Sequence, residues 1–282
     1  MLSVVRIEAV VTDLDGTVVR SDFSISPATI EALDLVRSAG IAFVIATART
    51  PQGLEHFQEL AGRTAVAVCC SGAIGWRSHH KTMAWMEELP PTATRRVVEI
   101  ALGEDAGVAS FDGALWRMTE EYWRLSPTQP HGPTRVVVDS AVVAETACCT
   151  MAMRHANGDL RHIAELVAAE ADSAALSHVG RSTVLDVTAR GVDKGTGTCR
   201  ALRALGIDAT AAISFGDMPN DLAMFRVTGR SYAVGDSDED VMRTATEVLP
   251  SVEDDGFARK ISELAAANWT IEDADPAALA TG

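Results

Sequence analysis

Short apolar runs alternate with amphipathic segments along the first seventy residues of the chain. Three of the runs are mostly apolar, which is typical of strands buried on both faces, and they lie at 7–12, 41–46 and 65–70. Ser26-Pro27, a capping residue followed by proline, begins a helix that ends at Gly40, and Thr50-Pro51 begins another. This order predicts a parallel, doubly wound (Rossmann-like) α/β sheet with right-handed crossovers.

The pattern changes in the middle of the chain. Strand-like runs and helical patterns alternate there, at 94–102, 108–111, 135–138, 149–153 and 159–169. The parallel α/β pattern resumes after Gly191 and continues to about Leu264. We therefore expect a discontinuous domain comprising 1–79 and 189–282, with a second α/β domain inserted at 80–188. The small, acidic tail from about Ala265 is expected to fray at its end.

The composition limits the partners of the chain. Its 282 residues are 47% hydrophobic and 22% charged, which is ordinary for a globular protein, and the formal net charge is -15. Non-specific nucleic-acid binding uses clustered Lys and Arg, so an acidic chain is a poor match for it. No apolar stretch reaches the roughly 18 to 20 residues of a membrane span, and no signal-type segment precedes the first strand. We expect a cytoplasmic protein without nucleic-acid or membrane partners.

The five cysteines are two adjacent pairs and one single residue, namely Cys69-Cys70, Cys148-Cys149 and Cys199. None has the C-x-x-C spacing of a zinc or redox site, and all lie in apolar strand-like or helical contexts. We expect reduced, buried thiols.

Two carboxylates follow the first predicted strand, in the string Asp13-Leu14-Asp15-Gly16-Thr17. Side chains two positions apart in a strand point to the same side. In open α/β sheets, ligands bind in the crevice at the carboxyl ends of the strands. Asp13 and Asp15 can therefore share one site.

Three further polar features stand at strand ends or helix starts. They are Thr47 after the second strand, Lys194 at the start of the helix after Gly191, and Gly216-Asp217-Met218-Pro219-Asn220-Asp221 after the strand that ends at Phe215. Each alone has an ordinary explanation: a strand-end hydroxyl, a solvated lysine, and a polar turn that caps a helix. Together with the two carboxylates, their order along the chain predicts a phosphate site.

Four separated motifs in this order resemble those of the haloacid dehalogenase (HAD) superfamily of phosphotransferases. The long insertion between Thr47 and Lys194, with the strings G-V-D-K-G and G-D-M-P-N-D, resembles the Cof-type hydrolases, whose caps are α/β. The resemblance covers nearly the whole chain, since Val234-Gly235 and residues 252–256 also fit the family's C-terminal pattern. It implies a Rossmann-like HAD core with an α/β cap inserted between the second and third motifs.

The resemblance also implies roles for the core residues. Asp13 is the nucleophile that forms an aspartyl-phosphate, and Asp15 protonates the leaving oxygen and then deprotonates water, which requires a raised proton affinity in a closed site. Mg²⁺ is expected on the Asp13 carboxylate, the Asp15 backbone carbonyl and Asp217. Thr47 and Lys194 are expected to bind the phosphoryl group.

Further phosphate and substrate contacts are expected from Leu14, Asp15, Ala48, Ser71, Gly72 and Asn220. Asp221 is expected to orient Lys194 or a metal-bound water rather than to bind the metal. Three positions depart from the family pattern, and one of them is Asp236, which replaces a common asparagine and adds negative charge near the site. Ala48 replaces a glycine, which is tolerated at negative φ, and Ser71 replaces an asparagine, which shortens the reach of that side chain.

The cap is expected to close over the crevice and to read the group attached to the phosphate. Four tryptophans lie in or near it, at Trp76, Trp85, Trp116 and Trp123. They can stack on a sugar or ring, but packing within the cap or its hinge is the favoured interpretation. His79-His80 is expected to be a solvated hinge rather than a metal pair.

The sequence therefore predicts a Mg²⁺-dependent phosphatase of small phosphorylated metabolites, and the resemblance implies sugar or polyol phosphates. A phosphosugar mutase of the same fold and a phosphometabolite-binding regulator without turnover stay open as alternatives. The intact acid/base Asp15 argues against the regulator, because a binding protein does not need it. The oligomeric state, monomer or homodimer, also stays open.

Overall fold

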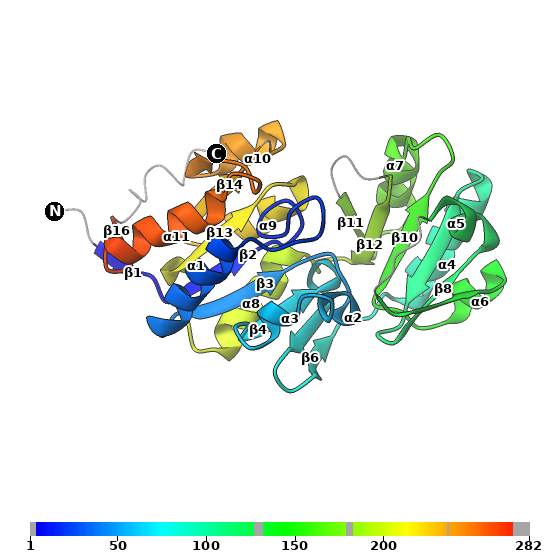
Figure 1. The fold of residues 1–282 in the computed structure, drawn as a ribbon. Helices are drawn as coiled ribbons and strands as arrows, with labels where there is room; N and C mark the ends of the chain where they lie inside the picture. The colour runs from blue at the N-terminus through cyan, green and yellow to red at the C-terminus, as the bar shows by residue number, and fades with distance from the viewer. Residues whose placement is uncertain (1–3, 127–131, 179–182, 236, 273–282) are drawn as a thin grey trace.

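The computed structural model describes residues 4–126, 132–178, 183–235 and 237–272. Figure 1 shows two α/β bodies side by side: a larger core, built from both ends of the described chain, and a smaller cap, built from its middle. The first and last described strands, β1 (Val4–Arg6) and β16 (Thr270–Glu272), pair as a separate antiparallel ribbon on the core.

The core is organised around one eight-stranded sheet. In spatial order its strands are β15 (Glu247–Leu249), β14 (Arg230–Val234), β13 (Ala212–Gly216), β2 (Ala9–Thr12), β3 (Ala42–Ala46), β4 (Val66–Cys69), β5 (Ile74–Arg77) and β6 (Thr82–Met86). The first six pair in parallel, and β5 and β6 add an antiparallel hairpin at the edge. The central strands are almost wholly buried, which confirms the doubly wound sheet predicted from their apolar pattern.

Helices cover both faces of the core sheet, because successive residues of its strands are apolar on both sides. On one face lie α1 (Pro27–Ser38), α2 (Pro51–Leu54), α3 (Gln58–Ala61) and α11 (Gly256–Ala266). On the other face lie α8 (Lys194–Ala204), α9 (Leu222–Phe225) and α10 (Glu239–Thr244). The predicted helix starts are correct, since the Ser26 and Thr50 hydroxyls accept hydrogen bonds from the amides of Thr29 and Gly53.

Three short 3-10 turns complete the core: η1 (Cys70–Gly72), η2 (Ala209–Ala211) and η3 (Pro219–Asp221). The tail that the sequence predicts to fray continues as the end of α11 and as β16 as far as Glu272. Residues 273–282 lie outside the described residues.

The cap is a six-stranded mixed sheet with helices on one side. In spatial order its strands are β11 (Ala174–His178), β12 (Leu185–Ala189), β10 (Thr150–Arg154), β7 (Gly107–Phe111), β8 (Leu115–Met118) and β9 (Thr134–Val137). The helices α4 (Pro91–Gly103), α6 (Ser140–Glu145) and α7 (Arg161–Glu170) pack on one face, over side chains such as Val108, Met151 and Val187. Within the described chain, the other face is covered by the short α5 (Glu120–Leu125) and by the core.

The core sheet continues beyond residue 79, the position at which the sequence predicts that the first segment of the core ends. The strand β6 pairs with β5 and ends at Met86, and the turn between the two strands carries His79 and His80, both exposed. The hinge predicted at these histidines is therefore wrong, because the chain folds back on the core there instead of leaving it. On this topology we propose domain boundaries near residues 87 and 189.

The tryptophans mostly pack, as the favoured interpretation predicts. Trp85 is buried against the core, and Trp76 is partly buried there. In the cap, the Trp116 ring lies 5.2 Å from that of Phe111, measured between centroids. Trp123 differs, because its side chain is 46% exposed beneath the Arg135 guanidinium.

All five cysteines are free thiols, as predicted, and all except the partly buried Cys199 are buried. Among the described residues, no helix combines the length and the apolar character needed to cross a membrane.

Candidate active site

A buried ion pair joins Asp13, at the end of β2, to Lys194, at the start of α8. Asp13 follows β2, and its backbone N–H donates to the carbonyl of Phe215 on β13 at 2.9 Å, so the side chain stands at the carboxyl end of the core sheet. Its Oδ1 accepts a hydrogen bond from Nζ of Lys194 at 2.7 Å. Lys194 is the first residue of α8, where Asp193 caps the helix. The Asp13 and Lys194 side chains are 8% and 1% exposed, so water screens their attraction weakly.

Asp221 completes the surroundings of the lysine. Its Oδ1 accepts from Lys194 Nζ at 2.7 Å, and its Oδ2 accepts from the backbone N–H groups of Asp217 and Met218, each at 3.0 Å. The side chain is fully buried. Because both oxygens are used, Asp221 holds Lys194 and the loop after β13 in place, which suits the orienting role expected of it.

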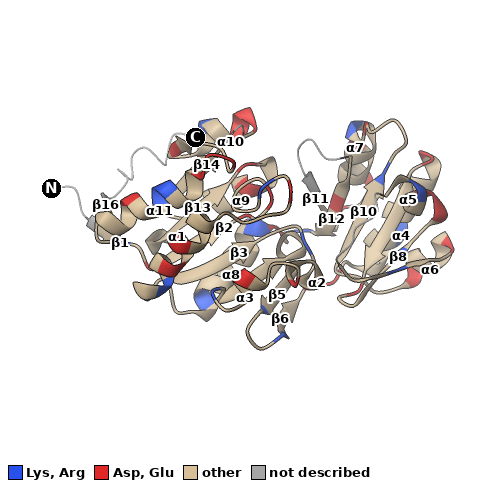
Figure 2. Ribbon diagram, in the orientation of Figure 1, with Lys and Arg blue, Asp and Glu red and all other residues tan. Residues whose placement is uncertain are grey.

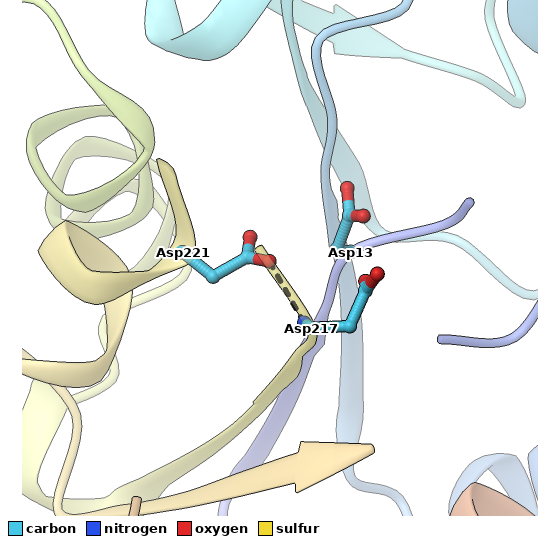
Figure 3. A group of neighbouring side chains, drawn as sticks. All are labelled: Asp13, Asp217 and Asp221. Atoms are coloured by element: carbon cyan, nitrogen blue, oxygen red, sulfur yellow. Dashed lines mark hydrogen bonds between the residues drawn. The ribbon is translucent and has the colours of Figure 1, made fainter. Parts of the chain in front are cut away.

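Asp217 follows β13 and lies beside Asp13 (Figure 3). Its Oδ1 accepts from the hydroxyl of Thr17 at 2.8 Å. Gly16 has a φ of +86°, and a Cβ there would lie 2.5 Å from Oδ2 of Asp217, so only glycine allows this approach. Thr17 is a residue that sequence reasoning missed, although it belongs to the same string as the two predicted carboxylates.

The three carboxylates of Asp13, Asp217 and Asp221 place oxygens within 4.8 Å of one another, and Figure 3 shows them around one space. Asp221 has both oxygens occupied, whereas Asp13 and Asp217 each keep one oxygen without a partner among the described residues. Hard carboxylate oxygens are the ligands that Mg²⁺ prefers. The donor set therefore fits a divalent cation.

Negative charge is in excess at this site. Burial raises the pKa of Asp13 well above its usual range; Lys194 opposes this shift, and the neighbouring carboxylates add to it. Burial also raises the pKa of Asp217 to about 7, with Asp221 adding to the effect. Burial lowers the pKa of Lys194, but the attraction of Asp13 and Asp221 outweighs this and raises it overall. One ammonium among several carboxylates leaves charge that a divalent cation can neutralise.

Asp15 is held away from the ion pair by Arg49. The Nε and one terminal nitrogen of Arg49 donate to the two carboxylate oxygens, each at 2.7 Å, and the Asp15 side chain is 47% exposed. The guanidinium also lies 5.0 Å from the centroid of the Phe57 ring. The enclosed environment expected for Asp15 is therefore not present in this conformation. Arg49 is a second residue that sequence reasoning missed, although it follows directly on Thr47-Ala48.

Unpaired donors lie in the two loops that follow β2 and β3. Among the described residues, the backbone N–H groups of Leu14, Asp15 and Ala48 make no hydrogen bond. Ala48 has a negative φ, as its replacement of glycine requires. Thr47 is buried, and its hydroxyl accepts from the amide of Arg49 at 3.1 Å and keeps its own hydrogen free to donate. Leu14 and Thr47 are buried, and a buried donor without a partner is costly, so a ligand that accepts from these groups is expected.

Asn220 and Ser71 lie at the edges of the site. The side-chain oxygen of Asn220 is buried without a partner among the described residues. Ser71 is buried at a φ of 52°, and its backbone N–H donates to the carbonyl of Thr47 at 3.0 Å. Gly72 has a φ of +112°, and a Cβ there would lie 2.1 Å from the carbonyl oxygen of Asp193. This geometry favours packing of Gly72 against the start of α8 over contact with a substrate.

Four features meet at the carboxyl ends of β2, β3 and β13. They are a carboxylate that can act as a nucleophile, a buried lysine, a set of carboxylates that fits a cation, and unpaired N–H donors. These features define the class of α/β enzymes that transfer phosphoryl groups.

The chain belongs to the haloacid dehalogenase-like hydrolase family, whose model matches residues 10–261. It is 26% identical to pyridoxal phosphate phosphatase YbhA of Escherichia coli (strain K12), over 88% of this chain and 95% of that protein. It is 28% identical to a phosphoglycolate phosphatase of Halorubrum lacusprofundi, over 89% and 95%.

A solved structure of a HAD subclass IIB sugar phosphatase matches the fold with a TM-score of 0.82 at 20% identity, covering 91% of this chain and 98% of that one. The family match confirms the resemblance stated from the motifs, and the structural match confirms an HAD core with an α/β cap. The protein is a HAD-type phosphatase, a phosphoric monoester hydrolase that acts on small phosphorylated metabolites.

Proposed function

We propose that the protein hydrolyses sugar or polyol phosphates in a Mg²⁺-dependent reaction that forms an aspartyl-phosphate on Asp13. One observation carries the proposal: the buried Asp13 carboxylate, fixed at one oxygen by Lys194, stands beside unpaired N–H donors at the end of β2. A nucleophile held in one orientation beside donors for the transferred group lowers the barrier by positioning and by electrostatic stabilisation.

The phosphoryl oxygens are bound by groups that the protein itself leaves free. The N–H groups of Leu14, Asp15 and Ala48 and the Thr47 hydroxyl donate to them, and Lys194 supplies a positive charge. The Asp13 and Asp217 carboxylates and the Asp15 backbone carbonyl hold Mg²⁺, which supplies positive charge against the phosphate and the carboxylates when it is bound.

The chemistry takes two steps at one phosphorus atom. First, a carboxylate oxygen of Asp13 forms a bond to phosphorus as the bond to the leaving oxygen breaks, and Asp15 gives that oxygen a proton. Next, water attacks the phosphorus and gives a proton to Asp15, and the bond to the Asp13 oxygen breaks. Inorganic phosphate leaves, and both aspartates return to their starting states.

Asp15 must leave Arg49 before it can carry a proton, because the guanidinium occupies both of its oxygens. Rotation of its side chain toward the leaving oxygen when the cap closes satisfies this requirement. Catalytic hydrogen bonds are often formed only in the complex with substrate, so the pairing of Asp15 with Arg49 in this structure is compatible with the acid role.

The test is phosphate release by the purified protein from a panel of esters, with and without Mg²⁺. The panel includes glucose 6-phosphate, sorbitol 6-phosphate, 2-phosphoglycolate, pyridoxal 5′-phosphate and p-nitrophenyl phosphate. We expect Mg²⁺-dependent release, fastest from the sugar or polyol esters. An isomeric sugar phosphate without free phosphate indicates the mutase, and binding without any product indicates the regulator. Either outcome overturns the proposal.

A further inference from the structure

The cap presents one face of its sheet to the active site. The faces are distinguished by the register: Asp186 of β12 pairs with Ala152 of β10, and Ala152 pairs with Ala109 of β7, so these side chains share a face. Phe111 belongs to the same face and packs in the apolar cluster that also contains Cys70 of the core. The strand β11 lies against η3 of the active-site loop. In Figure 1, β11 and β12 are the cap strands nearest to the core.

Asp186 is an unusual residue on this face. Its side chain is partly buried, yet among the described residues that side chain makes no hydrogen bond and no ion pair. Burial raises the pKa of its carboxyl to about 7, and the charges of Arg154 and Lys194 oppose this shift. A partly buried carboxylate without a partner is destabilising in a folded protein, so its place on the cap face that meets the core points to a ligand.

Arg154 provides a donor on the same face, two positions from Ala152. One terminal nitrogen donates to the hydroxyl of Thr183 at 2.8 Å, while Nε is buried without a partner among the described residues. The guanidinium also lies over the buried ring of Tyr122, 5.7 Å from its centroid. Figure 2 shows Asp and Glu positions in red and Lys and Arg positions in blue on both the core and the cap.

The strand that carries Asp186 leads directly into the catalytic lysine. After β12 the chain turns and begins α8 at Lys194, and the Thr188 hydroxyl fixes this turn by donating to the carbonyl of Val192 at 2.7 Å. The short connection from β12 to α8 therefore limits how far Asp186 can lie from the phosphate site. A group attached to a phosphate on Asp13 extends from the core toward this face of the cap.

Resting on the proposed function, we infer that Asp186 and Arg154 form the part of the cap that reads the leaving group, and that they select an uncharged, polyhydroxylated alcohol. Each hydroxyl of such an alcohol donates one hydrogen bond and accepts others, which matches a carboxylate acceptor beside a guanidinium donor. A leaving group with its own carboxylate or second phosphate gains less, because the attraction of Arg154 for that anion is offset by the repulsion of Asp186.

The test measures selection separately from turnover. Binding of glucose 6-phosphate and of 2-phosphoglycolate is measured by calorimetry in the Asp13→Asn background with Mg²⁺, and kcat/KM for both esters is measured in the otherwise unchanged enzyme. Asp186→Ala should lower the preference for glucose 6-phosphate by about tenfold or more in both experiments, since a lost hydrogen bond to a substrate hydroxyl costs that order of specificity. Arg154→Ala should lower the preference for glucose 6-phosphate in the same way.

The matched control is Glu165→Gln on α7, which removes an exposed carboxylate from the helix on the opposite face of the cap sheet. It should keep the wild-type preference. The inference is overturned if Asp186→Ala keeps the preference within about twofold of this control, or if the unchanged enzyme prefers 2-phosphoglycolate. If the enzyme shows no turnover but Asp186→Ala still shifts the binding preference, the result contradicts the proposed function and leaves the role of Asp186 in selection standing.

Discussion

The core and the cap each present a face to the active site, and the polar groups of these two faces differ in whether the protein itself pairs them. On the core side, charged side chains are held by the protein itself: Lys194 lies between two carboxylates, Thr17 holds Asp217, and Arg49 holds Asp15. On the cap side, Asp186 and the Nε of Arg154 have no partner among the described residues. Reaction chemistry needs fixed geometry, whereas recognition needs groups that are left for the ligand.

The strongest test of the core side is Asp13→Asn. The amide keeps the size of the side chain but is a poor nucleophile, so kcat should fall by about 10⁴-fold or more on every ester, whatever its leaving group. Steady-state kinetics and circular dichroism measure activity and folding together. The control is Asp34→Asn, which removes a paired carboxylate on α1, bound to Arg63, and should keep full activity. A variant at Asp13 that retains a few per cent of activity excludes it as nucleophile.

Lys194→Met tests whether the core pairs are needed for stability as well. The substitution leaves the buried Asp13 and Asp221 without their cation, which should reduce the free energy of unfolding by about 3–5 kcal/mol. Lys260→Met is the control, because Lys260 is also buried but its partners Glu247 and Glu263 are exposed, so the expected loss is about 1 kcal/mol. Urea unfolding measures both. Equal losses contradict a special role for burial of the carboxylates.

Asp15→Asn separates proton transfer from the rest of the core chemistry. Hydrolysis of glucose 6-phosphate should slow by about 10²–10⁴-fold, because its alkoxide leaving group needs a proton, whereas p-nitrophenyl phosphate should be affected much less. The ratio of kcat on the two esters is the readout. The same loss on both esters argues against the acid role and leaves Asp15 a structural partner of Arg49.

Asp186→Asn tests the cap side through the pH dependence of stability. Because the pKa of Asp186 is about 7 in the folded state and near its usual value when unfolded, the folded protein alone holds this proton between about pH 4 and 7. The stability that this proton contributes is lost as pH rises. The variant should therefore gain about 4 kcal/mol relative to wild type between pH 4 and 8, since each of the roughly three pKa units is worth about 1.4 kcal/mol. Urea titrations at both pH values measure the difference in unfolding free energy between the variant and the wild type. If this difference is the same at the two pH values, Asp186 is not an isolated carboxyl.

Much of the core could be predicted from the sequence because its signals are local. The strands β2, β3 and β4 are apolar runs, and each is followed by the polar group that its end presents. The edge hairpin of β5 and β6 was missed because its β6 strand is partly exposed and its tryptophans suggested the inserted domain. Alternation of exposed and buried positions at an edge gives a weaker pattern than a buried strand.

The pairings within the site could not be predicted, because they join residues distant in sequence. Nothing local to Arg49 indicates that it holds Asp15, 34 positions away. Asp186 has no motif either, since a single acidic residue in a strand gives no spacing to recognise. Its isolation follows from the register of β10, β11 and β12, which the folded sheet alone defines.

The ion pair between Asp13 and Lys194 also bears on how a cap can be inserted at all. It closes a chain segment of 181 residues. Loop-closure entropy grows only with the logarithm of length, so closing 181 residues instead of roughly 80 costs about 0.7 kcal/mol more. Glu87, where the chain enters the cap, and Arg200, after it returns, are joined by an ion pair, so a folded cap shortens the effective loop further. Caps of very different size can therefore be accommodated at this point of the core with little loss of stability.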